Sequence, residues 1–180
     1  MKLRHAISAI LATATLFGAQ TANAGAISVD GGWVGFCFDA GANQPATAGC
    51  QNDANSISGN PFTFTSVNSM LLKITDAFVV GDTFRVNDGT NDILFTSAPG
   101  AGPGGVNDPD AAFASGYYSA GSLLLAPGAY SLSVFTVNTV SSGGAYLRVD
   151  TAQSVPEPAS LPLVGLSLAA AWVIRRRRTQ

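Results

Sequence analysis

The chain has 180 residues, of which 47% are hydrophobic and 11% charged, and its formal net charge is −2 at pH 7. Six of the nine basic residues lie in the two terminal segments, whereas all eleven acidic residues lie between Asp30 and Glu157. The stretch 25–158 therefore has three basic residues against eleven acidic ones, a net charge of −8. This charge argues against nucleic acid or anionic lipid as a partner and permits divalent cations.

The first 24 residues have the composition of an export signal. Lys2 and Arg4 form a positively charged start, an apolar or small-residue stretch follows, and Ala22-Asn23-Ala24 is an A-x-A cleavage site. A retained helix is the alternative, which fits less well because the apolar core is short and rich in alanine. We expect a cleaved signal helix over 1–24, which leaves Gly25 as the mature N-terminus and removes His5, the single histidine.

The absence of histidine after export limits the chemistry of the exported portion. Neither a Ser-His-Asp triad nor a histidine metal ligand can then be built. We therefore expect no enzyme. An aspartate-dependent glycoside hydrolase is the remaining catalytic alternative, since it needs only two carboxyl groups across a cleft, but the spacing of the aspartates selects no pair.

Cys37 and Cys50 are the only cysteines, and export delivers both to an oxidising compartment. We expect a structural disulfide, worth about 3 kcal/mol in the chain-entropy model. A redox role would need a closer pair or a histidine. The enclosed residues 38–49 are rich in Gly, Ala, Asn and Pro, which predicts a flexible loop.

Short alternating segments over 27–150 predict half-buried antiparallel strands. The clearest are 62–65, 70–75, 83–86 and 130–137, with turn signals such as Gly81-Asp82, Asp88-Gly89 and Pro127-Gly128 between them. Eight or nine such strands predict an all-β domain over 25–150, an antiparallel β-sandwich of jelly-roll type.

One short helical turn is expected within this all-β domain. Asp108 is a good N-cap, Pro109 suits the first helical position, and Gly116 suits the end.

Two groups of side chains are candidates for ligand binding. Calcium takes about six to eight oxygen ligands, which clustered loop aspartates can supply, and the candidates are Asp82, Asp88, Asp92, Asp108 and Asp110. Because aspartate is also an ordinary turn and cap residue, the main expectation is that no cofactor binds. Exposed aromatic rings could stack on sugars, and the candidates are Trp33, Tyr117, Tyr118 and Tyr146, although core or edge packing is the more common role of such rings. Trp33, in the sequence 31–36, is expected to lie in a core strand.

The C-terminal residues combine three segments. Val155-Pro156-Glu157-Pro158 lies in a linker, 151–158, whose prolines keep it extended and outside helix or sheet. The uncharged stretch 159–174 predicts a single transmembrane helix, although a full span needs about 20 residues. The basic tail 175–180 predicts a cytoplasmic stop, formed by Arg175, Arg176, Arg177 and Arg178. A buried helix with a solvated basic tail is the alternative.

In this order, the proline-glutamate-proline motif, the apolar stretch and the arginine cluster resemble the PEP-CTERM protein-sorting signal over 154–178. The resemblance implies export by a Gram-negative bacterium that makes exopolysaccharide, with the tail recognised by exosortase, a membrane transpeptidase-like enzyme. It implies a precursor anchored in the inner membrane and then delivered to the cell surface or extracellular matrix. Parts of 75–128 also resemble an ectodomain type that many PEP-CTERM proteins carry, with no ligand attached to it.

The expected function is that of a structural or adhesive surface protein associated with exopolysaccharide. A carbohydrate-binding module is the alternative, and the aspartate-dependent hydrolase is less favoured.

Overall fold

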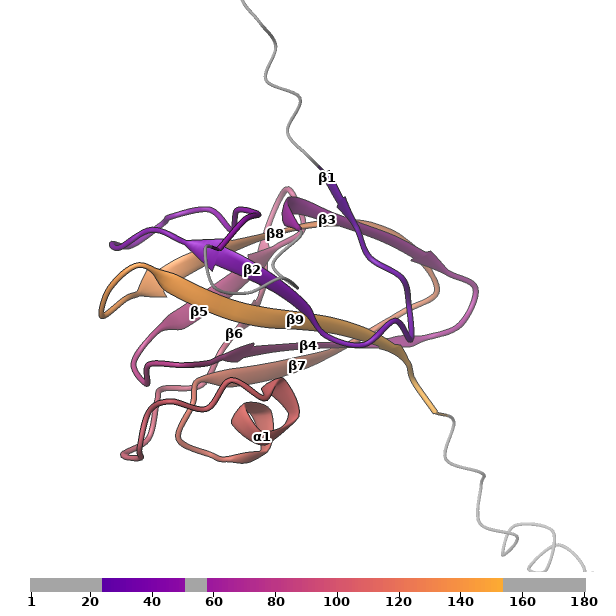
Figure 1. Cartoon of the computed structure of the whole chain (residues 1–180). Coiled ribbons are helices and arrows are strands. Elements are labelled where there is room, and N and C mark those ends of the chain that lie inside the picture. Colours follow the sequence, from indigo (N-terminus) through magenta and orange to yellow (C-terminus); the bar gives the residue numbers. More distant parts are fainter. Residues whose placement is uncertain (1–23, 51–57, 154–180) are drawn as a thin grey trace, which may run out of the picture.

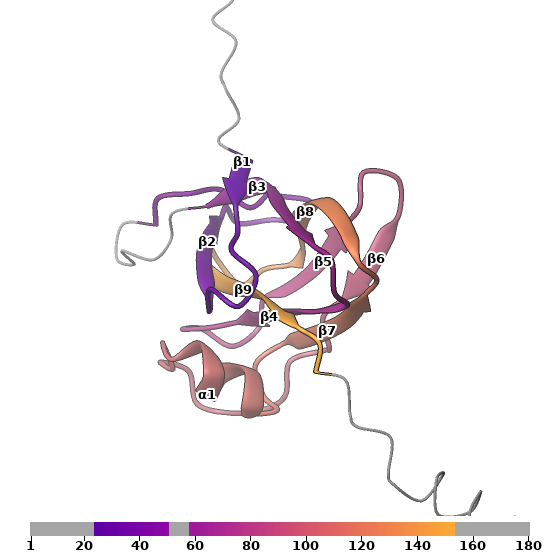
Figure 2. The same cartoon turned by 90° about the vertical axis from the view of Figure 1, so that its right-hand side faces the viewer.

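The computed structural model describes residues 24–50 and 58–153, which form two β-sheets and one short helix (Figures 1 and 2). One sheet contains, in spatial order, β1 (Ala24–Ala26), β3 (Gly59–Ser66), β8 (Gly128–Asn138), β5 (Thr83–Asn87) and β6 (Asp92–Phe95). The other contains β2 (Val34–Phe38), β9 (Gly143–Thr151), β4 (Met70–Asp76) and β7 (Ala120–Leu125). The rest of the predicted signal segment, the sorting motif, the predicted transmembrane stretch and the arginines lie outside the described residues.

The strand order confirms an all-β sandwich. From β2 onward the chain crosses to the opposite sheet at every connection except the one between β5 and β6. The resulting orders, β2-β9-β4-β7 and β3-β8-β5-β6, are those of a jelly roll, and all of these pairings are antiparallel. β1 is an addition that pairs with β3 in parallel.

The core lies between the sheets and follows the predicted alternation. On β4, Met70, Leu72 and Ile74 are fully buried, and on β8 so are Leu132 and Val134. Because successive strand residues point to opposite faces, the intervening residues form the outer faces of the sandwich. Aromatic rings fill the space between strands, as in the edge-to-face contacts of Phe36 with Phe62 and Phe84.

The predicted disulfide between Cys37 and Cys50 is present, with a Cα–Cα distance of 5.4 Å. The enclosed loop 38–49, predicted from its composition to be flexible, has backbone hydrogen bonds to β8. Ala46 N donates to Val134 O at 3.0 Å, and Thr136 N donates to Gln44 O at 3.0 Å. The edge of β8 beyond the start of β3 thus supplies the partners that these peptide groups need.

The helix α1 (Pro109–Ala114) was predicted at this place. The Asp108 carboxylate accepts hydrogen bonds from Asp110 N at 2.9 Å and Ala111 N at 3.2 Å, as an N-cap does. The helix packs against β4, on the outer face of its sheet (Figure 1). Within the described ranges, no helix has the length and apolar character that a membrane span requires, and the stretch 159–174 lies outside them.

Candidate functional site

Charged side chains converge on the outer face of the β2-β9-β4-β7 sheet. Lys73 of β4 lies opposite Arg148 of β9 in the strand register, and Asp150 lies two residues further along β9. Lys73 Nζ is 3.2 Å from Asp150 Oδ2, and Arg148 Nε is 2.6 Å from Asp150 Oδ1. Hydrogen bonding to Asp150 raises the pKa of Arg148, so this guanidinium stays charged. One carboxylate therefore holds both cations in fixed positions.

The helix α1 adds an aromatic side to this face. The Trp33 indole Nε1 donates to Asp110 Oδ1 at 2.9 Å, and its ring centroid lies 5.7 Å from that of Phe113. Arg148 Nη1 lies 3.5 Å from Asp110 Oδ1, with its guanidinium 5.9 Å from the Trp33 ring centroid. The prediction of Trp33 as a core strand residue is wrong, because the indole is half-buried ahead of β2 and finds its acceptor on α1.

The segment before β2 closes one end of the face. Asp30 Oδ1 accepts from Thr151 N and Asp30 Oδ2 from Thr151 Oγ1, both at 2.7 Å. These hydrogen bonds hold the pKa of Asp30 below its usual value. The N-terminal part of the domain is thereby joined to the end of β9, from which the chain continues to the sorting motif.

The charged groups of β4, β9 and the segment before β2 line a pocket of about 400 Å³, which we call the outer-face pocket. Its lining combines both signs of charge, hydroxyl and amide groups, and one leucine: Asp30, Leu71, Lys73, Arg148, Asp150, Thr151, Ala152 and Gln153. None of these residues was predicted as a site residue from the sequence. A signal was nevertheless available, because Lys73 and Arg148 are two of the three basic residues between the terminal segments.

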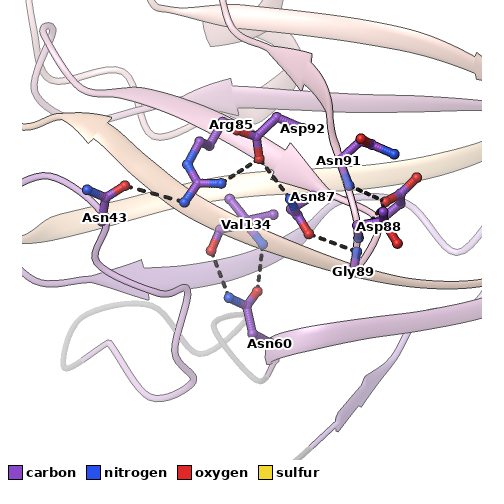
Figure 3. A network of polar contacts seen from close by, with 10 residues as sticks. Asn43, Asn60, Arg85, Asn87, Asp88, Gly89, Asn91, Asp92 and Val134 are labelled. Atoms are coloured by element: carbon purple, nitrogen blue, oxygen red, sulfur yellow. Dashed lines mark hydrogen bonds and ion pairs between the residues drawn. The ribbon is translucent and has the colours of Figure 1, made fainter.

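A second polar network lies on the outer face of the opposite sheet (Figure 3). Arg85 forms an ion pair with Asp92, donates to Asn43 Oδ1 at 3.3 Å, and lies 4.5 Å from the Phe135 ring centroid. In the adjoining hairpin, Asp88 Oδ1 accepts from the backbone N–H groups of Thr90 and Asn91. These contacts support a tight turn.

The five aspartates proposed as calcium ligands are not brought together. Asp88 and Asp92 belong to the hairpin, Asp108 and Asp110 to α1, and Asp82 is buried, accepting from Val140 N at 2.7 Å. The described residues contain no group of three or more Asp, Glu, His or Cys side chains that could hold a metal ion. Asp88 accepts hydrogen bonds in a turn, Asp108 caps α1, Asp92 and Asp110 form ion pairs, and Asp82 accepts a hydrogen bond in the core.

The predicted sugar-stacking tyrosines are largely covered. Tyr118 is 1% exposed and Tyr146 is 5% exposed, while Tyr117 is half-buried beside Tyr118. The Tyr118 hydroxyl accepts from Val106 N at 3.0 Å and donates to Phe78 O at 3.3 Å. A second hydrophobic cluster under α1 buries these rings, so Tyr118 and Tyr146 do not form an exposed platform.

Two carboxyl groups are buried together near the end of β4: Asp76, which was not predicted as a site residue, and Asp82, which was predicted as a calcium ligand. Asp76 is fully buried at the end of β4, where Oδ1 accepts from Ala77 N at 2.8 Å and Oδ2 from Asp82 N at 3.2 Å. Burial, and then the charge of Asp82, raise the pKa of Asp76 to about 7, and burial also raises the pKa of Asp82. The alternation that buries Met70, Leu72 and Ile74 predicts an inward side chain at 76 as well.

Comparison with known proteins identifies the C-terminal segment. Residues 154–178 match the family model of the PEP-CTERM protein-sorting motif, while no curated protein and no solved structure matches the chain. The match covers the proline-glutamate-proline sequence, the apolar stretch and the arginine cluster. The chain therefore carries a PEP-CTERM protein-sorting motif, which indicates export and sorting by an exosortase-type enzyme.

Proposed function

We propose that the β-sandwich is a structural or adhesive protein of the cell surface or extracellular matrix of a Gram-negative bacterium, associated with exopolysaccharide. The observation that carries this proposal is the sorting motif over 154–178. In this proposal the signal over 1–24 is cleaved, and the stretch 159–174 holds the precursor in the inner membrane until its tail is processed.

The carboxyl groups of the domain favour a role without catalysis. A glycoside hydrolase needs an accessible acid with a raised pKa. Asp76 and Asp82 have a raised pKa but are at most 2% exposed, so a sugar chain cannot reach them. At the accessible Asp30, Asp88 and Asp92 the pKa is instead lowered by hydrogen bonds. The protein acts without a cofactor in this proposal.

The mass of the C-terminal peptide, measured on protein recovered from the native host, tests the sorting route. We expect a chain that ends near 156–158, or carries an adduct there, in the extracellular fraction. Glu157→Ala should abolish this processing, whereas Thr179→Ala, just outside the matched residues, should not. An intact terminus at Gln180 in both the wild type and the variants would contradict the proposal.

A further inference from the structure

We propose that the outer-face pocket binds one uncharged sugar ring of a polysaccharide. The proposal rests on the surface role given above and assigns a ligand class and specific residues to it. It differs from the tyrosine platform expected from the sequence, because the pocket lies on β4 and β9 beyond the part of the face that α1 covers.

The charges of the pocket select an uncharged ligand. Asp30 and Asp150 repel an anion, while Lys73 and Arg148 repel a cation, and the four formal charges sum to zero. The surrounding domain is strongly acidic, so this neutral patch is a local feature of the surface. A ligand that offers hydrogen-bond donors and acceptors without a net charge fits it best.

The ion pairs hold donors and acceptors side by side. Asp150 engages Lys73 through one oxygen and Arg148 through the other, yet the three side chains remain 25%, 29% and 15% exposed for Lys73, Arg148 and Asp150. Their unused N–H groups and carboxylate lone pairs therefore face solvent in positions fixed by two neighbouring strands. Neighbouring hydroxyl groups of a sugar each donate and accept, which matches such a mixed set.

The size and the apolar parts of the site also suit a sugar ring. The volume of about 400 Å³ lies near the lower end of the range found for small-molecule sites. Leu71 adds an apolar surface inside the pocket, and Trp33 lies next to Arg148 at its border. Apolar surface of this kind can contact the C–H groups of a ring whose hydroxyls bond to the charged residues.

Isothermal titration calorimetry of the full chain, purified from its host, tests the site. The probes are a neutral oligosaccharide set (cellotetraose, maltotetraose and mannotetraose), the anionic polygalacturonate and the cationic chitosan tetramer. We expect at least one neutral probe to bind and both charged probes to bind more weakly. Absence of binding to every neutral probe, or preference for a charged one, would overturn the proposal.

Matched variants locate the binding. Arg148→Gln removes the guanidinium beside Asp150, and Lys73→Gln removes the ammonium, and each should weaken binding about tenfold or more. Arg85→Gln is the control, because it removes an arginine that is likewise paired with an aspartate and an aromatic ring, on the opposite sheet. Circular dichroism identifies any variant that fails to fold. If one of the two pocket variants does not fold, the sugar affinity of the other pocket variant tests the site.

Equal loss of binding in Arg85→Gln, or unchanged binding in both pocket variants, would reject the site. The surface role can fail separately, because the C-terminal peptide mass tests it without any sugar. A correctly processed extracellular protein that binds no neutral probe would leave the surface role standing and refute the pocket.

Discussion

At the scale of single residues, five carboxyl groups have a shifted pKa, and they fall into two classes with opposite pH behaviour. Asp30, Asp88 and Asp92 are accessible, and hydrogen bonds to their charged forms lower each pKa. Asp76 and Asp82 are buried, and desolvation raises their pKa values. A buried carboxyl beside a second one is destabilising when both are ionised.

The raised pKa of Asp76 predicts that the domain loses stability as the pH rises. Its folded pKa of about 7 exceeds the ordinary value of 3.8, so between these values the folded state binds more protons than the unfolded state. The free energy of unfolding should therefore fall from pH 4 to pH 7, by at most about 1.4 kcal/mol per pH unit for one proton, and then level off. Urea denaturation at several pH values measures this slope.

Asp76→Asn isolates this contribution. The variant loses an acceptor for the loop N–H groups and should be less stable throughout, but its stability should depend less on pH over this window. Asp39→Asn, at an exposed position, should keep the wild-type slope. A slope in Asp76→Asn identical to that of the wild type would show that Asp76 ionises normally.

At the scale of elements, β8 organises one half of the sandwich. It pairs with β3 and β5 along most of its length, and beyond the start of β3 the loop 43–46 takes over as its neighbour. The Asn60 side chain completes this transition, since its amide bonds to both Val134 O and Val134 N at 2.8 Å (Figure 3). The disulfide thus closes a loop that backbone hydrogen bonds already hold.

This arrangement predicts how the domain responds to loss of the disulfide. Replacing both Cys37 and Cys50 by serine should cost about 3 kcal/mol and lower Tm by on the order of 10 °C. Because the loop keeps its bonds to β8, the variant should still unfold in a single cooperative transition. Differential scanning calorimetry measures both quantities.

The reductant control uses the same instrument. Dithiothreitol should lower the Tm of the wild type and leave that of the double variant unchanged. An unfolded double variant at room temperature would contradict the role given to the β8 contacts.

At the scale of the whole molecule, stability comes from the apolar layer between the two sheets. The inward residues of β4, β8 and β9 meet there, and the largest fully buried side chains include Phe36, Phe62, Phe84 and Leu72. The outer faces carry the ion pairs and the pocket, so stability and binding use opposite sides of the same strands. Substitutions in the core should therefore lower the free energy of unfolding, whereas substitutions on the outer faces should change it little.

Leu72→Ala and Leu124→Ala form a matched test of this separation. Leu72 is fully buried, so its truncation leaves a cavity and should cost about 2–5 kcal/mol in the free energy of unfolding. Leu124 is 65% exposed on β7, and its truncation should change stability by about 0.5 kcal/mol or less. Comparable losses in a urea denaturation experiment would mean that the outer face of β7 is covered by a partner.

Features that local chemistry controls could be predicted from the sequence. Alternation located the strands and the inward faces, Asp108-Pro109 located the helix start, and the lone cysteine pair located the disulfide. The sorting motif could also be predicted from the sequence, because its three parts follow one another directly within 154–178.

Which outward-facing residues meet depends on the tertiary fold. Asp30 and Thr151 are 121 positions apart, and Trp33 and Asp110 are 77 apart, so no local pattern joins them. The burial of Tyr118 and Tyr146, and the attachment of the disulfide loop to β8, likewise depend on how α1 and the sheets lie against one another. Contacts between distant segments arise from the folded arrangement of the whole chain, and alternation alone says only which side of a sheet each residue faces.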